Sequence, residues 1–146
     1  MRRVSLLLAA AALLLALSAG VALAKTLIGD DGPNVIVGTD RADFIDGQGG
    51  DDLIVGGRGP DRLVGGYGDD TIYGGGGNDA VNGGPGNDTI IVGDDANGPK
   101  GADQYACGPG EDIAYVSSAD NSTLEDDGCE ETTNEDPPPT PPTPVP

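Results

Sequence analysis

A nine-residue repeat constrains the folding of this chain more than any other feature of its sequence. Seven units follow one another without a gap from Gly29 to Ile91. Each unit starts with glycine, has Asn34 or an aspartate in sixth place, and has an aliphatic residue in eighth place. Such a fixed order of residue types is not expected of a disordered or merely soluble acidic tract, which composition alone would allow. The repeat therefore predicts a solenoid.

The two parts of each unit predict different local structure. Glycines allow positive φ angles, so the first six residues are expected to form a turn. The last three residues place one side chain inward and its neighbours outward, which is typical of a short strand. Two units then make a coil of 18 residues with one strand in each of two facing sheets. The predicted fold is all-β: a parallel β-roll, or right-handed β-solenoid, of about seven to nine repeats.

The aspartates of such a roll indicate a cation site. Aspartates one coil apart would stack at the strand spacing of about 4.8 Å, and two buried aliphatic side chains per coil do not offset the cost of ordering the backbone. An ion between successive coils would take carboxylates from both coils and carbonyl oxygens from the glycine turns. Oxygen ligands in flexible loops favour Ca²⁺ over Mg²⁺. The chain has no histidine, which disfavours Zn²⁺ and Cu²⁺.

The units resemble G-G-x-G-x-D-x-U-x, the calcium-binding nonapeptide of RTX proteins, also called the hemolysin-type calcium-binding repeat. The units GGRGPDRLV, GGYGDDTIY, GGGGNDAVN and GGPGNDTII, from Gly56 to Ile91, carry every consensus position. The resemblance implies a β-roll that holds about three to five calcium ions between stacked turns. The expected side-chain ligands are Asp43, Asp52, Asp61, Asp70, Asp79 and Asp88. The glycines expected to form the turns and offer their carbonyls are Gly57, Gly59, Gly66, Gly68, Gly75, Gly77, Gly84 and Gly86.

The first units depart from this pattern. Asn34 replaces an aspartate, and Arg41 replaces a turn glycine. Sites that use those two turns are expected to be weak or absent. The best-supported sites join Asp52 with Asp70, Asp61 with Asp79, and Asp70 with Asp88.

After Ile91 the register breaks, and the chain then returns to the pattern. An insertion of six residues, VGDDAN, precedes the degenerate units GPKGADQYA and CGPGEDIAY. Cys107 and Cys129 are expected to form a disulfide in an exported protein; a metal site, the alternative, lacks identifiable partner ligands. A bridge would tie residues 117–131 over the end of a roll spanning 25–116, similar to the C-terminal caps of secreted actinobacterial RTX-repeat proteins, and contribute roughly 3 kcal/mol.

Both termini predict segments outside the roll. Residues 1–24 have two arginines, an apolar run and a terminal Ala22-Leu23-Ala24, which predicts a secretory signal cleaved after Ala24. The alternative is an uncleaved anchor helix. Cleavage would leave a secreted, extracellular protein without a membrane span. Residues 132–146 are acidic and then proline-rich, which indicates an extended disordered tail, with a stalk or a ligand for a proline-binding partner as alternatives.

Charge and composition narrow the function. A net charge of −18 disfavours nucleic acid as a partner. Without histidine there is no HExxH site and no Ser-His-Asp triad, and paired aspartates that recur in every unit are better explained as ligands than as a glycosidase dyad. We therefore expect a secreted calcium-binding protein that folds on binding Ca²⁺, not an enzyme. The alternative is a calcium-dependent adhesion module that binds cell-surface or extracellular polysaccharide, with Phe44, Tyr67 and Tyr73 as its aromatic surface.

Overall fold

The structure is a computed structural model of the 146-residue chain. It describes residues 24–92, 103–116, 128–129 and 131–133. Within these ranges every regular element is a β-strand. The predicted all-β class is therefore confirmed.

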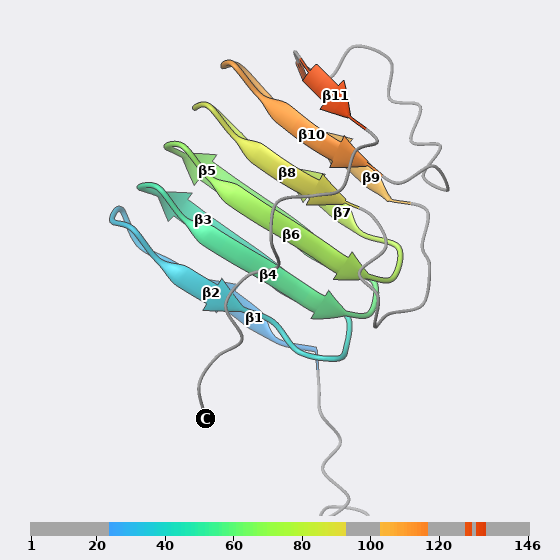
Figure 1. Ribbon diagram of the computed structural model, residues 1–146. Helices are drawn as coiled ribbons and strands as arrows, with labels where there is room; N and C mark the ends of the chain where they lie inside the picture. Colours follow the sequence, from blue (N-terminus) through green and yellow to red (C-terminus); the bar gives the residue numbers. More distant parts are fainter. Residues whose placement is uncertain (1–23, 93–102, 117–127, 130, 134–146) are drawn as a thin grey trace, which may run out of the picture.

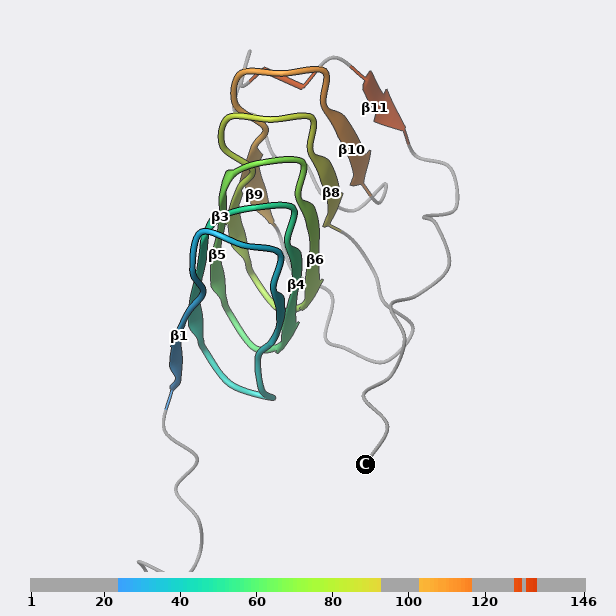
Figure 2. The ribbon, with the colours of Figure 1, turned by 90° about the vertical axis from the view of Figure 1, so that its left-hand side faces the viewer.

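The strands form two parallel sheets that face each other and make a flattened coil (Figures 1 and 2). We call them sheet A and sheet B. Sheet A has the order β1 (Thr26–Ile28), β3 (Phe44–Gly49), β5 (Arg62–Tyr67), β7 (Ala80–Asn82) and β9 (Gln104–Ala106). Sheet B has the order β2 (Val35–Val37), β4 (Leu53–Arg58), β6 (Thr71–Gly76), β8 (Thr89–Val92), β10 (Ile113–Val116) and β11 (Glu131–Thr133). Because consecutive strands from β1 to β10 alternate between the sheets, the chain winds as a parallel β-solenoid, as predicted.

The register of the strands follows the repeat. Ile45 lies beside Leu63 in sheet A, and Ile54 lies beside Ile72 in sheet B, each pair two units apart. Val81 lies beside Tyr105, so this coil of sheet A is longer by the six inserted residues. The insertion is accommodated between β8 and β9 without shifting the register of the strands on either side.

The core is a single file of side chains between the sheets. The eighth residues of the units point inward and are fully or almost fully buried: Ile45, Ile54, Leu63, Ile72, Val81 and Ile90. At the C-terminal end Val92, Cys107 and Ala114 extend this core, and at the N-terminal end Leu27 and Ile36 are only partly buried. The first coil is more exposed because, among the described residues, no further coil lies on its outer side.

The strands differ from the expectation in length and in number. Three-residue strands were expected, but β3 to β6 each contain six residues. They are longer because the backbone also pairs at the glycines that open the next unit, for example Gly57 with Gly75. The structure also adds β1 before the first unit and β11 after the last one. The predicted count of repeats therefore omitted one strand at each end.

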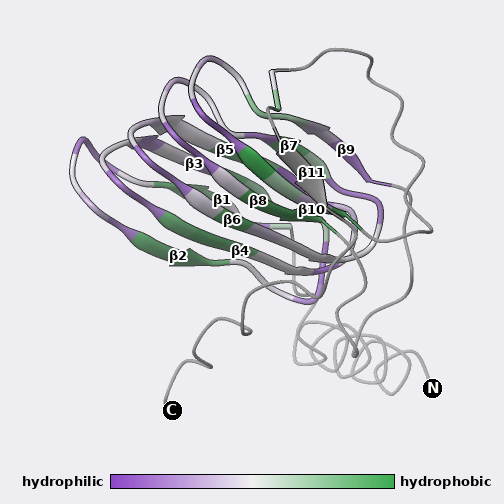
Figure 3. Ribbon diagram, turned by 45° about the horizontal axis from the view of Figure 1, so that its top comes forward, coloured by the Kyte–Doolittle hydropathy of each residue, from purple (hydrophilic) through white to green (hydrophobic). Residues whose placement is uncertain are grey.

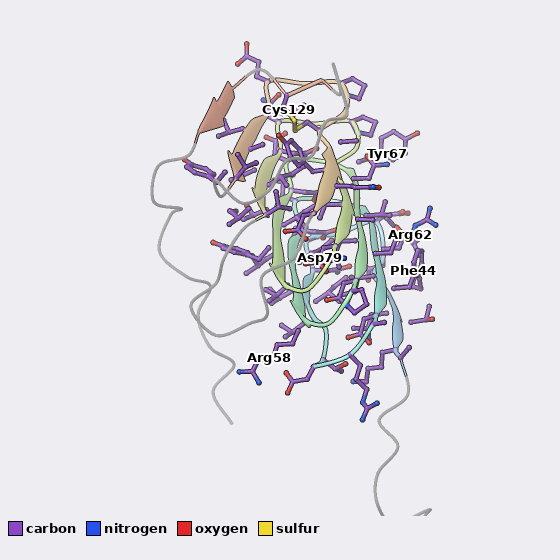
Figure 4. The ribbon with its side chains drawn as sticks, turned by 90° about the vertical axis from the view of Figure 1, so that its right-hand side faces the viewer. Phe44, Arg58, Arg62, Tyr67, Asp79 and Cys129 are labelled. Carbon is purple, nitrogen blue, oxygen red and sulfur yellow. A yellow bond between two sulfur atoms is a disulfide. The ribbon has the colours of Figure 1, made fainter. Side chains whose placement is uncertain are left out.

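The predicted disulfide is present. Cys107, which is fully buried, is bonded to Cys129, with their Cα atoms 5.1 Å apart (Figure 4). β11 follows Cys129 closely and pairs with β10. The bond thus fastens the last strand of sheet B to the turn that precedes β10.

The terminal predictions lie almost entirely outside the described residues. These are the signal at 1–24, of which only Ala24 is described, most of the cap at 117–131, and the tail from 134 onward. In the part of the chain that is described, no helix is long and apolar enough to cross a membrane.

Candidate metal centre

The turns of the roll stack along two edges, and each edge gathers one set of sixth-position residues. One edge, which we call the Asp70 edge, carries Asn34, Asp52, Asp70, Asp88 and Asp112. The other, which we call the Asp61 edge, carries Asp43, Asp61, Asp79 and Asp103. All eight aspartates are at least 96% buried. The separation into two edges and the stacking within each are as predicted.

Each aspartate binds the backbone of the coil before it. The Oδ1 atom of Asp70 accepts a hydrogen bond from the backbone N–H of Asp52 at 2.9 Å, and Oδ1 of Asp88 accepts one from Asp70 at 2.9 Å. On the Asp61 edge, Oδ1 of Asp61 accepts from the N–H of Asp43 at 2.7 Å, and Oδ1 of Asp79 from Asp61 at 2.8 Å. These bonds form a ladder along each edge and fix the orientation of every carboxylate.

The other carboxylate oxygen is the unusual feature of the site. Among the described residues, Oδ2 is buried without a hydrogen-bond partner in Asp52, Asp61, Asp70, Asp88 and Asp112. A buried carboxylate oxygen without a partner is costly unless a donor or a cation satisfies it. This oxygen is unsatisfied in four successive coils of the Asp70 edge and in Asp61 of the other edge, so the feature follows the repeat.

Backbone carbonyl oxygens crowd the same region. A Cβ atom added to Gly65 would collide both with Oδ2 of Asp70 and with the carbonyl oxygen of Gly83 in the next coil. The equivalent position at Gly47 is bounded by Oδ2 of Asp52 and the carbonyl of Gly65. Only glycine fits here, and its small size leaves a carboxylate oxygen and a carbonyl oxygen from neighbouring coils close together.

The turn glycines have the backbone conformation expected of them. All eight predicted glycines have positive φ angles: Gly57, Gly59, Gly66, Gly68, Gly75, Gly77, Gly84 and Gly86. Their turns stack closely, since a Cβ on Gly75 would meet the carbonyl oxygen of Gly57 one coil earlier. The turns therefore line each edge with carbonyl oxygens.

These donors fit a hard cation that accepts mixed oxygen ligands. No three acidic side chains converge on one point among the residues that the structure describes, so carboxylates alone would not complete a coordination shell. Ca²⁺ takes six to eight oxygen ligands and accepts backbone carbonyls among them. The residues present at each edge, one carboxylate per turn with glycine carbonyls beside it, match that requirement.

The electrostatics of the buried carboxylates point the same way. Burial, strengthened by the neighbouring carboxylates, raises the pKa of Asp61 to about 7, of Asp70 to about 6 and of Asp88 to about 7. Burial also raises the pKa of Asp52. A carboxylate with a raised pKa lacks enough positive charge around it in the protein itself. A bound cation would supply that charge.

The first turns differ, as their sequences suggested. Burial raises the pKa of Asp43, but hydrogen bonds from Lys25 and Thr39 outweigh it and hold the pKa below its usual value. Both oxygens of Asp43 are in use, because Oδ1 accepts from the N–H of Lys25 and Oδ2 accepts from the N–H and hydroxyl of Thr39. Asn34 donates to Asp30 at 3.1 Å. The protein thus satisfies these side chains without an ion.

Two buried aspartates were not among the predicted ligands. Asp112 and Asp103 continue the ladders, since Oδ1 of Asp112 accepts from the N–H of Asp88 and Oδ1 of Asp103 from that of Asp79. Both occupy the sixth place of the degenerate units, which was the signal available in the sequence. The broken register concealed how closely these units stack on the preceding coils.

A second, exposed ladder was also missed. On the Asp70 edge, the side chain of Asp51 accepts from the N–H of Asp69, that of Asp69 from Asn87, and that of Asn87 from Glu111. These are the fifth residues of alternate units. The corresponding residues of the Asp61 edge are Ala42, Pro60, Asn78 and Ala102. The polar fifth residues therefore support the stacking of turns on the Asp70 edge.

Comparison with known protein families gives one match. The family model for the RTX calcium-binding nonapeptide repeat, which spans four copies, matches residues 28–63 and again 58–90. No curated protein and no solved structure matches the chain. The matched region contains both edges from the first turn to Asp88.

Proposed function

Because residues 28–90 belong to the RTX calcium-binding nonapeptide repeat family, we propose that this chain is a secreted calcium-binding protein that folds when Ca²⁺ binds between its stacked turns. Its function would be to bind calcium and to fold on doing so, and not to catalyse a reaction. The proposed ligands are the glycine carbonyls of the two edges and their aspartates other than Asp43, whose two oxygens are already hydrogen-bonded. The corresponding functional parts are the roll from 25 to 116, the cap from 117, which ends with β11 at Thr133, and the tail from 134 to 146.

The observation that carries this proposal is the row of buried Oδ2 atoms. Oδ2 of Asp52, Asp70 and Asp88 lies unsatisfied in three successive coils of one edge. On the other edge Asp61 repeats the arrangement. These oxygens lack a bonding partner and a compensating positive charge. A bound calcium ion would supply both, because it is positively charged and takes six to eight oxygen ligands.

The chain's own residues would divide the work of binding. In the folded roll the Oδ1 ladder holds each carboxylate in place through the backbone of the preceding coil, so ion binding and the stacking of coils would stabilise each other. The turn glycines allow successive coils to approach closely enough to share it. Pairing of the strands then brings the eighth residues together in the core.

Secretion is the second part of the proposal. Residues 1–24 would direct export and be cleaved after Ala24. Calcium is far more abundant outside cells than inside, so a chain of this charge would stay unfolded until it had crossed the membrane. A Cys107–Cys129 disulfide fits an oxidising compartment.

Circular dichroism with and without calcium tests the proposal. Residues 25–146 are expected to be largely unstructured in chelator and to gain β signal at roughly 0.1–1 mM Ca²⁺, the range of extracellular modules. Equal concentrations of Mg²⁺ serve as the matched control and should give a much smaller signal. An unchanged β spectrum in excess chelator would show that folding does not depend on the metal.

The adhesion alternative gains no support from the placement of its aromatic residues. Phe44 lies on β3 of sheet A beneath Arg62, whose guanidinium carbon is 5.8 Å from the ring centroid (Figure 4). Tyr73 lies on β6 of sheet B, and Tyr67 lies at the end of β5. The three residues do not form one aromatic surface for a polysaccharide.

A further inference from the structure

The outward faces of the two sheets differ in their chemistry. In sheet B the ninth residues of the units lie side by side in one row across five strands. The members of this row are Val37, Val55, Tyr73, Ile91 and Tyr115. The matching row of sheet A is Ile28, Asp46, Val64, Asn82 and Ala106. We call the first set the apolar row. In Figure 3, which colours the ribbon by residue hydropathy, the hydrophobic colour is seen along β2, β4 and β8 of this sheet.

The apolar row carries no charge, although the chain as a whole has a net charge of −18. Val37 is 39% exposed, and Val55, Tyr73 and Tyr115 are partly buried. The two tyrosines flank Ile91, the most buried member of the row. Among the described residues, no third layer of strands lies against this face. A continuous uncharged row on the surface of an acidic protein indicates an interaction surface that another segment or molecule covers.

The position of the C-terminal segment identifies what could cover it. Tyr115 pairs with Thr133 of β11, so Thr133 occupies the next register position after the apolar row. The residues that follow are Asn134, Glu135 and Asp136, and then PPPTPPTPVP from 137 to 146. Three residues therefore separate the proline-rich segment from Thr133, the register position next to the end of the row.

Length and chemistry both suit this segment to the row. From β11 to β2 the strands of sheet B span about 24 Å at the usual strand spacing. Nine residues in a polyproline II conformation extend about 28 Å. Such segments dock on aromatic-lined surfaces, and their prolines bring no N–H groups that would need partners. Residues 137–146 have no charged side chain, so covering the row would bury no charge.

We propose that residues 137–146 fold back over sheet B and lie along the apolar row, with proline rings against Tyr73 and Tyr115. A second copy of the chain is a weaker occupant. The row spans four strand spacings, about 19 Å, and is about two residues wide, which amounts to a few hundred Å². A stable dimer commonly buries about 800 Å² on each partner.

Amide NMR of the calcium-loaded protein, residues 25–146, tests this proposal. The segment 137–146 contains only three residues with a backbone N–H: Thr140, Thr143 and Val145. If the segment is docked, their heteronuclear NOE values should resemble those of the strands. The variant Tyr73→Thr with Tyr115→Thr should lower these values and shift the three signals toward those of the isolated peptide 134–146. Threonine is chosen because it is already present on this face at Thr71 and Thr89.

Tyr67→Thr is the matched control, since Tyr67 is 73% exposed and lies outside the row. It should leave the three signals unchanged. The calcium-induced dichroism of all variants is recorded alongside, so that a loss of folding is recognised as such. For a variant that does not fold, Pro141→Ser with Pro142→Ser and Pro144→Ser tests the same contact from the other side and should also release the three amides.

Three results would overturn the proposal. The first is a set of three flexible amide signals in the unaltered protein. The second is signals that respond equally to Tyr67→Thr and to the double variant. The third is a concentration-dependent dimer that is lost in the double variant, which would assign the apolar row to a second copy.

Discussion

At the scale of single residues, the fold depends on two residue types, aspartate and glycine, with opposite effects on packing. Aspartate places a charged group in the interior, and glycine removes every side-chain atom from the turn around it. At Gly65, for example, the space that a Cβ would fill lies between Oδ2 of Asp70 and the Gly83 carbonyl. Each coil therefore has little apolar burial and a set of buried oxygens instead, and we propose that its stability depends on a bound ion.

Replacing Asp70 by asparagine tests the role of the charge. Asp70→Asn retains an oxygen that accepts the hydrogen bond from Asp52, but it removes the negative charge. We expect calcium affinity, measured by isothermal titration calorimetry, to fall at least about tenfold at the sites that share this residue, because contacts with charged groups contribute about 1.5–3 kcal/mol. In chelator the variant should show at least as much β signal as the unaltered protein, since the buried charge is gone.

Asp69→Asn is the matched control for Asp70→Asn. Asp69 is exposed and belongs to the outer ladder, in which Asn87 already occupies the next position. Its calcium affinity should stay within about twofold of the unaltered protein, as for an exposed charge. A large loss of affinity in both variants would mean that overall charge, not the buried oxygen, attracts the ion.

Replacing Gly75 by alanine tests the close stacking of the turns. Gly75 has a φ angle of 93°, and an added Cβ would collide with the carbonyl oxygen of Gly57. The calcium-loaded protein should lose about 2 kcal/mol or more of unfolding free energy in urea, because both the backbone conformation and the contact become strained. Gly32→Ala should lose much less, since the nearest atom to its added Cβ is 3.4 Å away. Equal losses would refute this account of the turns.

At the scale of elements, each strand contributes little by itself and depends on its two neighbours. One inward residue per strand, such as Ile54 or Ile72, reaches the core. A strand at either end of the roll has a neighbour on one side only, and the two ends differ in how that strand is covered. At the C-terminal end β11 covers β10 in sheet B and the disulfide holds it there. At the N-terminal end the first coil stays open, and Val35 of β2 is 72% exposed.

Removing the disulfide should weaken one end of the roll selectively. In Cys107→Ser with Cys129→Ser, the loss of a link across 22 residues should cost about 3 kcal/mol. Hydrogen exchange of the calcium-loaded protein should accelerate in β10 and β11 more than in β3 to β5. Uniform acceleration across all these strands would show instead that the roll unfolds as one unit.

At the scale of the whole molecule, the charge of the buried ladders sets the conditions for folding. The pKa values of Asp61, Asp70 and Asp88 in the folded chain are about 6 to 7, above the ordinary value of 3.8. The folded state thus binds protons that the unfolded state has already released. Without calcium, the stability of the roll is greatest below about pH 4 as far as these groups are concerned, and it is lost as the pH rises through 6 to 7.

This predicts that acid partly replaces calcium. Metal-stripped protein should gain β signal when the pH is lowered from 8 to about 5, and the gain should disappear on returning to pH 8. With calcium present, the apparent affinity should fall as the pH drops below about 7, because protons compete for the same carboxylates. Circular dichroism titrations in both directions measure the two effects. A metal-free β signal that increases with pH would contradict the prediction.

The sequence by itself determined the period, and with it most of the fold. A glycine in first place and an aliphatic residue in eighth place, as at Gly56 and Leu63, permit only a turn and an inward-facing strand residue. The alternation of units between two sheets and the two edges of aspartates follow from that period. The disulfide was predictable because residues 1–24 predict export, and two cysteines in exported proteins generally pair.

Only the tertiary structure decided how the two oxygens of each carboxylate are used. Oδ1 of Asp70 binds the backbone one coil away, whereas Oδ2 stays buried and unsatisfied, and no local pattern specifies this division. The structure also decided that Asp112 joins the ladder and that Tyr73, Ile91 and Tyr115 form one row. These contacts join residues 18 or more positions apart. The period places such residues near one another, but only the packing of whole coils sets which atoms meet.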